Sequence, residues 1–464
     1  MAEIQRGGEI SKLLASVERE AARWFEALDA RPVRATASGD ELRRALGGAL
    51  PEEGTAAETV IQMLARAGMQ GTVATAGPRY FGFVVGGSLP VAVGADWLVS
   101  AWDQNSGIYV LSPLMAAIEQ ITGAWLLELA GLPATMSFGF VTGCQMANFT
   151  ALAAARHRVL RDAGWDVEAD GLFGAPPIQI AVNEEAHYSI RMALRLLGLG
   201  GNRVHTIPID AQGRMRAADL ENALRGGKGP CIVCAQAGNV NTGAFDPLEE
   251  IAQLARERGA WLHVDGAFGL WAAATRERAR LVRGIERANS IATDAHKWLN
   301  VPYDCGIVFC ADETAHRSAM SLAAAYIVVT SSERDAHEFV PDESRRARAA
   351  PVYAALRSLG RRGFAELIER NCRQAGRFAE GLRTAGYEIL NEIVLNQVLV
   401  SFGTAEQTQR TIAAIQEDGT CWCAGTVWKN RTAMRISVSN WSTTDEDVER
   451  SLEAMIRAAR RCAD

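Results

Sequence analysis

The sequence predicts an α/β fold with a mostly parallel sheet in a large central domain, a smaller C-terminal α+β domain and an N-terminal helical segment. Between residues 136 and 310, short apolar runs alternate with amphipathic helical runs, which is typical of parallel strands joined by helices. Helical periodicity dominates up to about residue 75, and long helices with two-sided strands follow Gly360. We place the domains at residues 1–90 (helical segment and lid loop), 91–360 (large domain) and 361–464 (small domain).

Composition and charge argue against several kinds of partner. The 464 residues are 48% hydrophobic and 22% charged, with a net charge of −6, so nucleic acid and anionic membranes are not favoured. The longest apolar stretch, Phe81 to Trp102, is interrupted by Gly86, Pro90 and Asp96 and is a poor candidate for a membrane span. No basic segment followed by an apolar segment opens the chain. We therefore expect a cytoplasmic protein without a nucleic-acid or membrane partner.

The nine cysteines show no framework of a secreted protein. Cys231 and Cys234 have metal-ligand spacing, but both lie in the apolar run Pro230 to Ala235. Side chains three residues apart on a strand point to opposite faces, so this pair suits neither zinc nor redox chemistry. We predict no metal site.

The N-terminal part is expected to be helical at Glu9–Leu28 and Ala56–Gly68. An aromatic and glycine-rich loop follows, at Pro78–Phe83 and Gly86–Pro90. Such a loop is either a packed turn or the wall of a pocket. A long helix is expected at Pro113–Ala130.

Seven strands and the helices between them make up the predicted large domain. The strands are expected at Met136–Val141, Ile178–Val182, Val204–Ile209, Cys231–Ala235, Trp261–Val264, Ser290–Thr293 and Gly306–Cys310. The helices are expected at Gln145–Ala163, Ile190–Leu197, Ala217–Leu224 and Pro247–Glu257. The alternation predicts a sheet covered by helices on both faces.

The C-terminal domain combines long helices with two-sided strands. Helices are expected at Gly363–Ala385 and Glu406–Glu417, and strands at Gln397–Phe402 and Ala433–Ser439. The polar run at residues 443–447 is a helix start for a last helix that ends at Arg461.

Polar residues follow several predicted strands, where ligands bind in an open parallel sheet. Gly143, Cys144 and Gln145 follow the first strand and open a helix. A glycine turn at a helix N-terminus offers backbone N–H groups and a favourable dipole to a phosphate. Many strand-to-helix turns contain glycine, so this motif alone is weak.

Three further residues follow other strands: His187, Asp265 and Lys297. Singly, each has an ordinary explanation, because most such histidines are structural, many such aspartates form turns and most lysines are solvated. Together with the turn they describe a site for pyridoxal 5′-phosphate. Partial desolvation would lower the pKa of Lys297 for Schiff-base chemistry, Asp265 would keep the pyridine nitrogen protonated, and His187 would stack on the ring. The small Ala267 lets a flat ring approach.

Four motifs carry a resemblance to a known family. They are Ala186-His187-Tyr188-Ser189, His263-Val264-Asp265-Gly266-Ala267, His296-Lys297-Trp298-Leu299 and Ser344-Arg345-Arg346-Ala347-Arg348. From about Pro78 to its end the chain resembles the group II pyridoxal-phosphate-dependent amino-acid decarboxylases, which have the fold type I (aspartate-aminotransferase-like) architecture and include aromatic amino-acid and glutamate decarboxylases. The resemblance implies a pyridoxal-phosphate-binding large domain, His296 in the cofactor site, and a homodimer with shared active sites.

The resemblance also implies roles for Tyr326 and Arg435. Tyr326 lies 29 residues after the lysine (326 − 297), where the family has a loop tyrosine that protonates the product carbon. Its alternative is an ordinary, partly buried aromatic residue. The polar run from 330 to 338 suits a flexible lid. Arg435 resembles an arginine near the substrate carboxylate in many fold type I enzymes, and its alternative is a structural ion pair.

Candidate substrate contacts lie before the first strand. Phe83 is assigned to the pocket wall. Further candidate wall residues are Trp102, Asp103, Gln104 and Tyr109, which by analogy serve the neighbouring subunit. The chain departs from aromatic-substrate relatives at 83–86 and 105–107, so an aromatic substrate does not carry over. The phosphate turn has cysteine where relatives have more glycine, serine and threonine.

The run from Arg345 to Arg348 has two interpretations. It is either a nucleic-acid patch or a helix start that pairs with acidic neighbours or anchors the lid. The acidic chain favours the second.

The predicted function is decarboxylation of an L-amino acid to the amine and carbon dioxide. One alternative is another reaction on the same cofactor, such as aldehyde synthesis, amino transfer or carbon–carbon cleavage. A second is a non-catalytic cofactor-binding protein, which the intact Lys297, Asp265 and His187 disfavour. The substrate side chain and any assembly beyond a dimer stay open.

Overall fold

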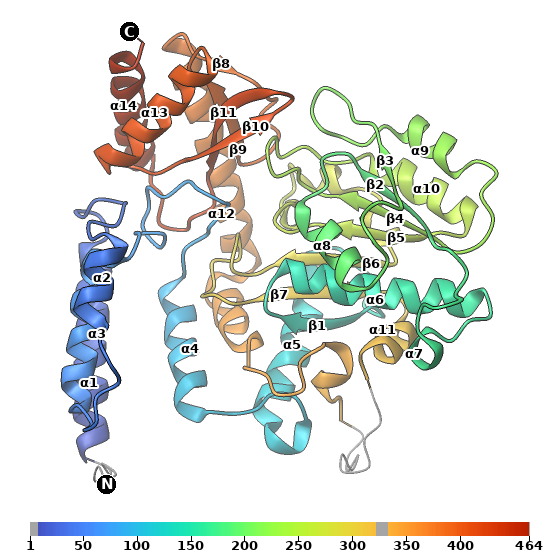
Figure 1. Ribbon diagram of the computed structural model, residues 1–464, viewed down its shortest axis with the longest axis horizontal. Coiled ribbons are helices and arrows are strands. Elements are labelled where there is room, and N and C mark those ends of the chain that lie inside the picture. Colours follow the sequence, from blue (N-terminus) through green and yellow to red (C-terminus); the bar gives the residue numbers. More distant parts are fainter. Residues whose placement is uncertain (1–7, 322–332, 464) are drawn as a thin grey trace.

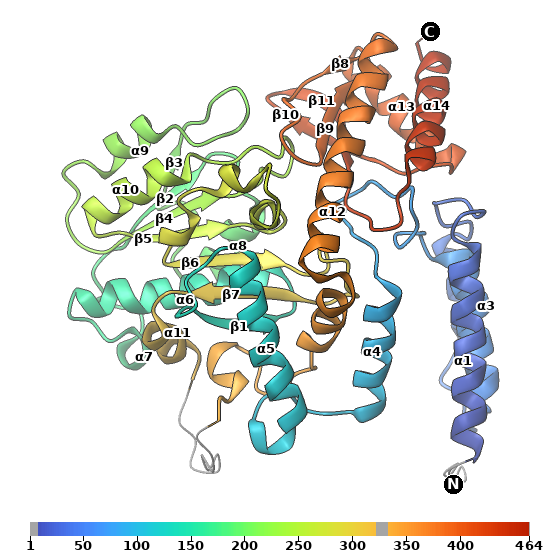
Figure 2. The ribbon, with the colours of Figure 1, turned by 180° about the vertical axis from the view of Figure 1, so that it is seen from behind.

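The computed structural model describes residues 8–321 and 333–463, and these form an α/β fold with two sheets (Figure 1). The larger sheet lies in the middle of the chain, and the smaller sheet belongs to the C-terminal part. The N-terminal helices α1, α2 and α3 stand beside helix α4 at one side of the molecule, as both views show (Figures 1 and 2). They span Gly8–Ala27, Gly39–Leu46, Ala57–Gly71 and Pro90–Trp102.

The larger sheet has seven strands in the order β1-β7-β6-β5-β4-β2-β3. They are β1 (Ser137–Val141), β2 (Gln179–Asn183), β3 (Val204–Ile207), β4 (Cys231–Gln236), β5 (Trp261–Asp265), β6 (Ser290–Asp294) and β7 (Gly306–Cys310). Only β7 runs antiparallel to its neighbours β1 and β6, and the pairs from β6 to β3 are parallel. The mostly parallel sheet is confirmed, and every predicted strand is present.

Helices cover both faces of this sheet (Figures 1 and 2). One face is covered by α6 (Cys144–Asp162), α8 (Tyr188–Leu196) and α11 (Glu313–Met320). The other is covered by α5 (Pro113–Leu129), α9 (Ala217–Leu224), α10 (Leu248–Arg258) and the first part of α12 (Ala349–Thr384). Short elements join them: α7 (Val167–Asp170), η1 (Tyr109–Leu111), η2 (Gly269–Ala274), η3 (Ala279–Val282), η4 (Ile285–Arg287) and η5 (Ala336–Phe339).

Strand β4 shows how the two faces are built. It is buried along its whole length, as a central parallel strand must be. Cys231 and Val233 belong to one hydrophobic cluster, and Ile232 and Cys234 belong to the cluster on the opposite face. The predicted separation of the two cysteines is therefore confirmed.

The smaller sheet is antiparallel, in the order β10-β11-β9-β8. Its strands are β8 (Glu388–Ile389), β9 (Gln397–Ser401), β10 (Ala424–Trp428) and β11 (Arg431–Ser437), packed against α12, α13 (Ala405–Asp418) and α14 (Asp445–Arg461). Thr444 caps α14 in a capping box with Asp447, which confirms the predicted helix start. Strand β10 was not predicted, because its turn to β11 uses Lys429 and Asn430 at positive φ rather than a glycine.

The sequence analysis missed two helical stretches. Helix α12 begins at Ala349 rather than at Gly363, and Pro351 lies in its first turn, where a missing N–H group costs no hydrogen bond. Gly360 then interrupts the helix at φ 62° and ψ 176°. Helix α4 was also missed, because Pro90 begins it instead of breaking it.

The division at residues 1–90, 91–360 and 361–464 stays a prediction. None of the helices within residues 8–321 and 333–463 is long and apolar enough to cross a bilayer.

A buried ionic cluster joins α5 to the segment that precedes α12. The carboxylate of Glu119, which is 2% exposed, accepts hydrogen bonds from Arg345 at 2.8 Å and Arg334 at 3.1 Å. Arg346 and Arg348 pair with Asp96 and Asp304, each at 2.8 Å. The prediction that this arginine run pairs with acidic neighbours is confirmed.

Glu119→Leu is expected to destabilise the fold by about 3–5 kcal/mol, because it leaves buried arginines without a counter-charge. Glu128→Leu is the matched control on the same helix. Its partner Arg361 is 55% exposed, so the loss is expected to stay below about 1 kcal/mol. Urea unfolding at equal protein concentration measures both. Equal losses of unfolding free energy in the two variants would contradict the role of Glu119 as the buried counter-charge of the arginines.

Candidate active site

The carboxyl ends of the parallel strands open onto a cavity of about 350 Å³. Ten predicted site residues line it: Phe83, Gly143, Cys144, Gln145, His187, Asp265, Ala267, His296, Lys297 and Arg435. They come from the loop before α4, from the turns after β1, β2, β5 and β6, and from β11. The structure therefore brings together residues that lie up to 352 positions apart (435 − 83).

The turn after β1 is the part of the cavity best suited to a phosphate. Gly143 precedes the 19-residue helix α6, which has no side-chain cap. The N–H of Cys144 donates to Asp294 Oδ1 at 2.6 Å. Among the described residues, the N–H groups of Gln145 and Met146 have no acceptor, so they remain available at the positive end of the helix.

The Cys144 side chain points away from this anion site. Its thiol donates to Asp265 Oδ1 at 3.4 Å. Burial, followed by the charges of Asp265 and Asp294, raises the pKa of the thiol well above its ordinary value, so it stays protonated and acts as a donor. At this position the turn therefore offers a phosphate its backbone N–H groups and not the Cys144 side chain.

Lys297 follows β6 and is held by Asp294, with Nζ 2.8 Å from Oδ2. Burial acts to lower the pKa of Lys297, but the Asp294 carboxylate outweighs it, and the pKa is raised. The expectation of a lowered pKa is therefore wrong for this state of the chain. The Lys297 backbone is also closely packed, since a Cβ atom at position 86 would lie 1.7 Å from the Lys297 carbonyl oxygen. Only glycine fits there.

His296 lies beside Lys297 and is fixed on both sides of its ring. Nδ1 accepts from the Cys305 N–H at 3.2 Å, and Nε2 is 3.4 Å from Asp294 Oδ1. Burial lowers the pKa of His296, so its ring is neutral at pH 7 with the proton on Nε2. The ring of Tyr303 stacks on it at 4.2 Å between centroids.

Asp265 ends β5 and is satisfied by neutral donors. Oδ1 accepts from the Ala267 N–H at 3.1 Å, and Oδ2 accepts from Asn148 Nδ2 at 3.1 Å. No arginine, lysine or histidine of the described chain forms an ion pair with it. A cationic ring nitrogen in the cavity would therefore meet an unpaired carboxylate, which is the partner that pyridoxal phosphate needs.

His187 caps the N-terminus of α8 and is held through one ring nitrogen. Nδ1 lies 2.8 Å from Ser189 Oγ. Burial lowers the pKa of His187, so the ring is neutral at pH 7. A neutral imidazole on the cavity wall can pack against a flat ring or donate to a carboxylate.

Arg435 enters the cavity from β11, with 8% of its surface exposed. Nη1 donates to the Val240 carbonyl at 3.2 Å, and Nε is buried without a partner. Burial lowers the pKa of Arg435. Within residues 8–321 and 333–463 no carboxylate pairs with it, so the alternative of a structural ion pair finds no support.

The loop from Pro78 to Pro90 is both a packed turn and a cavity wall. Phe83 lines the cavity, and its ring lies 5.6 Å from that of Trp422. Phe83 and Val84 have φ of 53° and 59°, and a left-handed conformation is strained for a β-branched residue. The wall is thus held in a conformation that its own residues do not favour.

The other candidate wall residues, Trp102, Asp103, Gln104 and Tyr109, do not line this cavity. Trp102 ends α4 with 43% of its surface exposed and is not among the lining residues, so its assignment to the partner's site stays a prediction. Tyr326 lies outside the described residues. Two functional candidates were missed. Asp294 lies two residues before the quoted lysine motif (296 − 294), and Asn148 lies one helical turn after Cys144.

Comparisons with known proteins agree with this geometry. The model of the pyridoxal-dependent decarboxylase conserved domain matches residues 40–404. The L-2,4-diaminobutyrate decarboxylase of Rhizobium meliloti is 31% identical over 89% of this chain and 84% of that protein. The aromatic-L-amino-acid decarboxylase of Bacillus atrophaeus is 28% identical over 91% and 89%.

The fold agrees as well. The crystal structure of Oryza sativa TDC with PLP and tryptamine matches with a TM-score of 0.93 and 21% identity, over 100% of both chains. This likeness confirms the expected fold class. The chain belongs to the family of pyridoxal-dependent decarboxylases.

Proposed function

We propose that this cavity carries out the reaction of the family, the decarboxylation of an L-amino acid to its amine and carbon dioxide. The observation that carries the proposal is the convergence of Lys297, Asp265, His187 and the open turn at Gly143–Gln145 in one cavity. These groups match what pyridoxal phosphate requires: free N–H groups for its phosphate, a carboxylate without an ionic partner in the described chain for its ring nitrogen, and a lysine amine for its aldehyde.

The residues would hold the cofactor at both ends. The N–H groups of the turn before α6 would hold the phosphate, and Lys297 would supply the amine for the aldehyde. Asp265 would serve the ring nitrogen, and His187, Ala267 and His296, which also line the cavity, would complete the binding site. When bound, pyridoxal phosphate supplies an electron sink for the electron pair left on Cα as carbon dioxide departs.

The chain's own residues prepare this step. Asp265 keeps a proton on the ring nitrogen, because its carboxylate has only neutral donors as partners in the described chain. The neutral His187 orients the substrate carboxylate out of the ring plane. Arg435 offers a buried guanidinium to a carboxylate of the substrate. Tyr326 is proposed as the donor that protonates Cα after carbon dioxide leaves.

The alternative outcomes differ in their products. An aldehyde synthase would release aldehyde, an aminotransferase keto acid, and a carbon–carbon lyase an aldehyde with glycine. A protonating Tyr326 favours release of the amine, so simple decarboxylation remains the proposal. A non-catalytic protein is disfavoured, because Lys297, Asp265 and His187 all line the cavity.

Lys297→Ala is expected to abolish carbon dioxide release and the cofactor absorbance that borohydride bleaches in the wild type. The measurement is carbon dioxide from a panel of carboxyl-labelled L-amino acids, with amine, aldehyde and keto acid quantified together. Lys228→Ala, which changes an exposed lysine outside the cavity, is the control and should keep full activity. Keto acid or aldehyde without equimolar amine would reject simple decarboxylation.

Asp294→Asn is expected to shift covalent cofactor capture to lower pH by roughly one to two units. The Asp294 carboxylate raises the pKa of Lys297, and only the deprotonated amine attacks an aldehyde. Capture by the wild-type apoprotein should therefore speed up as pH rises, and the variant should reach the same rate at lower pH. Stopped-flow absorbance at several pH values measures this. Asp162→Asn, on the exposed end of α6, should leave the profile unchanged.

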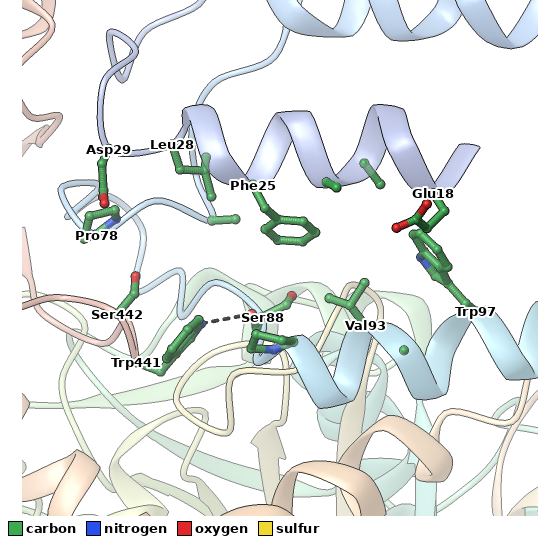
Figure 3. A pocket seen from close by; sticks show the side chains of 15 residues that line it. Glu18, Phe25, Leu28, Asp29, Pro78, Ser88, Val93, Trp97, Trp441 and Ser442 are labelled. Atoms are coloured by element: carbon green, nitrogen blue, oxygen red, sulfur yellow. Dashed lines mark hydrogen bonds between the residues drawn. The ribbon is translucent and has the colours of Figure 1, made fainter. Parts of the chain in front are cut away.

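We infer that the chain forms a homodimer through its N-terminal helices. A groove of about 510 Å³ lies between α1 and α4, and Phe25, Val93 and Trp97 line it (Figure 3). Large apolar side chains remain exposed on α1, α3, α4, η1 and α5. They include Leu14, Phe25, Met63, Leu64, Val91, Trp97, Leu98, Trp102, Val110, Leu111 and Leu114. An apolar surface of this extent marks an interaction site, and a second copy would cover it.

Leu98→Glu is expected to weaken this dimer by roughly 100-fold or more, because it places an unpaired charge at the interface of each subunit. Size-exclusion chromatography with light scattering measures the mass across a dilution series. Phe173→Glu is the control, since Phe173 is 97% exposed on a loop after α7. An unchanged dimer in the Leu98 variant would contradict the proposed interface.

We also infer a cytoplasmic location. All nine cysteines are free, and eight of them are buried. Free cysteines are typical of a reducing compartment.

A further inference from the structure

A buried polar network lies behind Asp265, outside the cavity. Its centre is Asn148, a residue of α6 without exposed surface. Asn148 Nδ2 donates to Asp265 Oδ2 and to Ser189 Oγ, each at 3.1 Å. Asn148 Oδ1 lies 2.9 Å from His263 Nε2. The Asn148 side chain thus bonds directly to Asp265 and, through Ser189, is connected to His187.

The network continues across two strands. His263, on β5, places Nδ1 3.0 Å from Ser290 Oγ on β6. The Trp261 indole N–H donates to the same hydroxyl at 2.8 Å. Trp261, Ser290, His263, Asn148 and Asp265 therefore form one continuous chain of hydrogen bonds.

The direction of every bond in this chain is fixed by its two ends. The Trp261 indole can only donate, and an ionised Asp265 can only accept. Burial lowers the pKa of His263 to about 4, so the ring carries a single proton at pH 7. Asn148 must turn its NH2 group to Asp265 and its oxygen to His263. His263 then donates from Nε2 and accepts from Ser290 at Nδ1.

A branch carries the same direction to His187. Ser189 Oγ accepts from Asn148, so its hydroxyl hydrogen is free to donate to His187 Nδ1 at 2.8 Å. The Ser189 backbone N–H also points to Nδ1, at 3.4 Å. Nδ1 is thereby an acceptor, and the proton of the neutral ring lies on Nε2.

We propose that Asn148 is a positioning residue that fixes the Asp265 carboxylate and the His187 tautomer together, through the Trp261–Ser290–His263 chain on one side and Ser189 on the other. Asn148 does not line the cavity, so it acts only through these two residues. This inference rests on the proposed function, because Asp265 and His187 matter only if the cofactor ring lies between them.

The coupling has a clear chemical purpose. Asp265 lacks an ionic partner in the described chain, so neutral donors alone decide where its charge points. A free amide could flip and present its oxygen to Asp265, which would repel the carboxylate. His263 prevents this flip, because its Nε2–H requires an acceptor on the other side. His263 thus fixes the Asn148 amide, and the Asn148 amide fixes the orientation of the Asp265 carboxylate.

The test uses Asn148→Leu and Ser290→Ala, compared with Thr150→Val. Thr150 is a buried polar residue of the same helix, but its hydroxyl bonds only to the Met146 carbonyl, at 2.9 Å. Asn148→Leu is expected to lower kcat roughly 10- to 100-fold, as loss of an outer-shell partner does. Ser290→Ala, which removes the hydrogen bonds of one hydroxyl to His263 and Trp261, is expected to lower kcat roughly 2- to 10-fold. KM should change by less than about twofold in both.

A spectroscopic measurement separates positioning from a general loss of structure. Holoenzyme is prepared with pyridoxal phosphate labelled with ¹⁵N in its ring and with ¹⁵N-histidine. Asn148→Leu and Ser290→Ala should both move the ring-nitrogen signal toward the unprotonated form. Asn148→Leu should also mix the two His187 tautomers. Thr150→Val should match the wild type in both signals.

The inference is overturned if a folded Asn148→Leu holoenzyme keeps the wild-type ring-nitrogen and His187 signals. If that variant does not fold, Ser290→Ala decides by the ring-nitrogen signal, and an unchanged signal overturns the inference. Failure of the proposed function would give a different result from failure of the positioning role. A wild-type enzyme that showed the protonated ring nitrogen yet released keto acid would reject decarboxylation and leave the positioning role intact.

Discussion

The rest of the site depends on the contacts of one buried carboxylate, that of Asp294. Its Oδ1 accepts the Cys144 N–H at the start of α6, and its Oδ2 pairs with Lys297 at 2.8 Å. These partners lie on opposite sides of β7, which separates β1 from β6 in the sheet. Asp294, itself 2% exposed, therefore ties the phosphate turn to the lysine across an intervening strand.

Two buried aspartates have opposite environments in one cavity. Asp294 pairs with Lys297, which compensates its charge within the chain, and the neutral ring of His296 lies 3.4 Å away. Asp265 has only neutral donors within the described residues: an amide side chain, a backbone N–H and a thiol. In a buried site an uncompensated carboxylate is costly unless a cation arrives. Asp265 is therefore the carboxylate that can pair with a cation bound in the cavity, which is the role proposed for the ring nitrogen.

The sequence predicted the sheet and most of the site because both follow from local patterns. Buried parallel strands are continuous apolar runs, and a residue that ends such a run must lie at the ligand-binding edge. His187, Asp265 and Lys297 were found in this way. Asp294 and Asn148 were missed because their roles depend on contacts 150 and 117 residues away (294 − 144 and 265 − 148). No spacing rule shows such contacts. Strand β10 was missed for a local reason, its Lys429-Asn430 turn.

The cavity also depends on parts of the chain that no active-site motif marks. Asn300, buried and at φ 56°, accepts the Leu89 N–H with its backbone carbonyl at 2.8 Å and the Trp441 N–H with Oδ1 at 2.8 Å. Its own N–H donates to the Lys297 carbonyl at 3.2 Å. The lysine turn, the loop that carries Phe83 and the segment after Arg435 therefore meet at one residue. Because each bond crosses between regions far apart in sequence, the wall and Arg435 reach the cavity only when the N-terminal loop and the C-terminal sheet have docked on the large sheet. The site is a product of the whole chain's folding rather than of the large sheet alone.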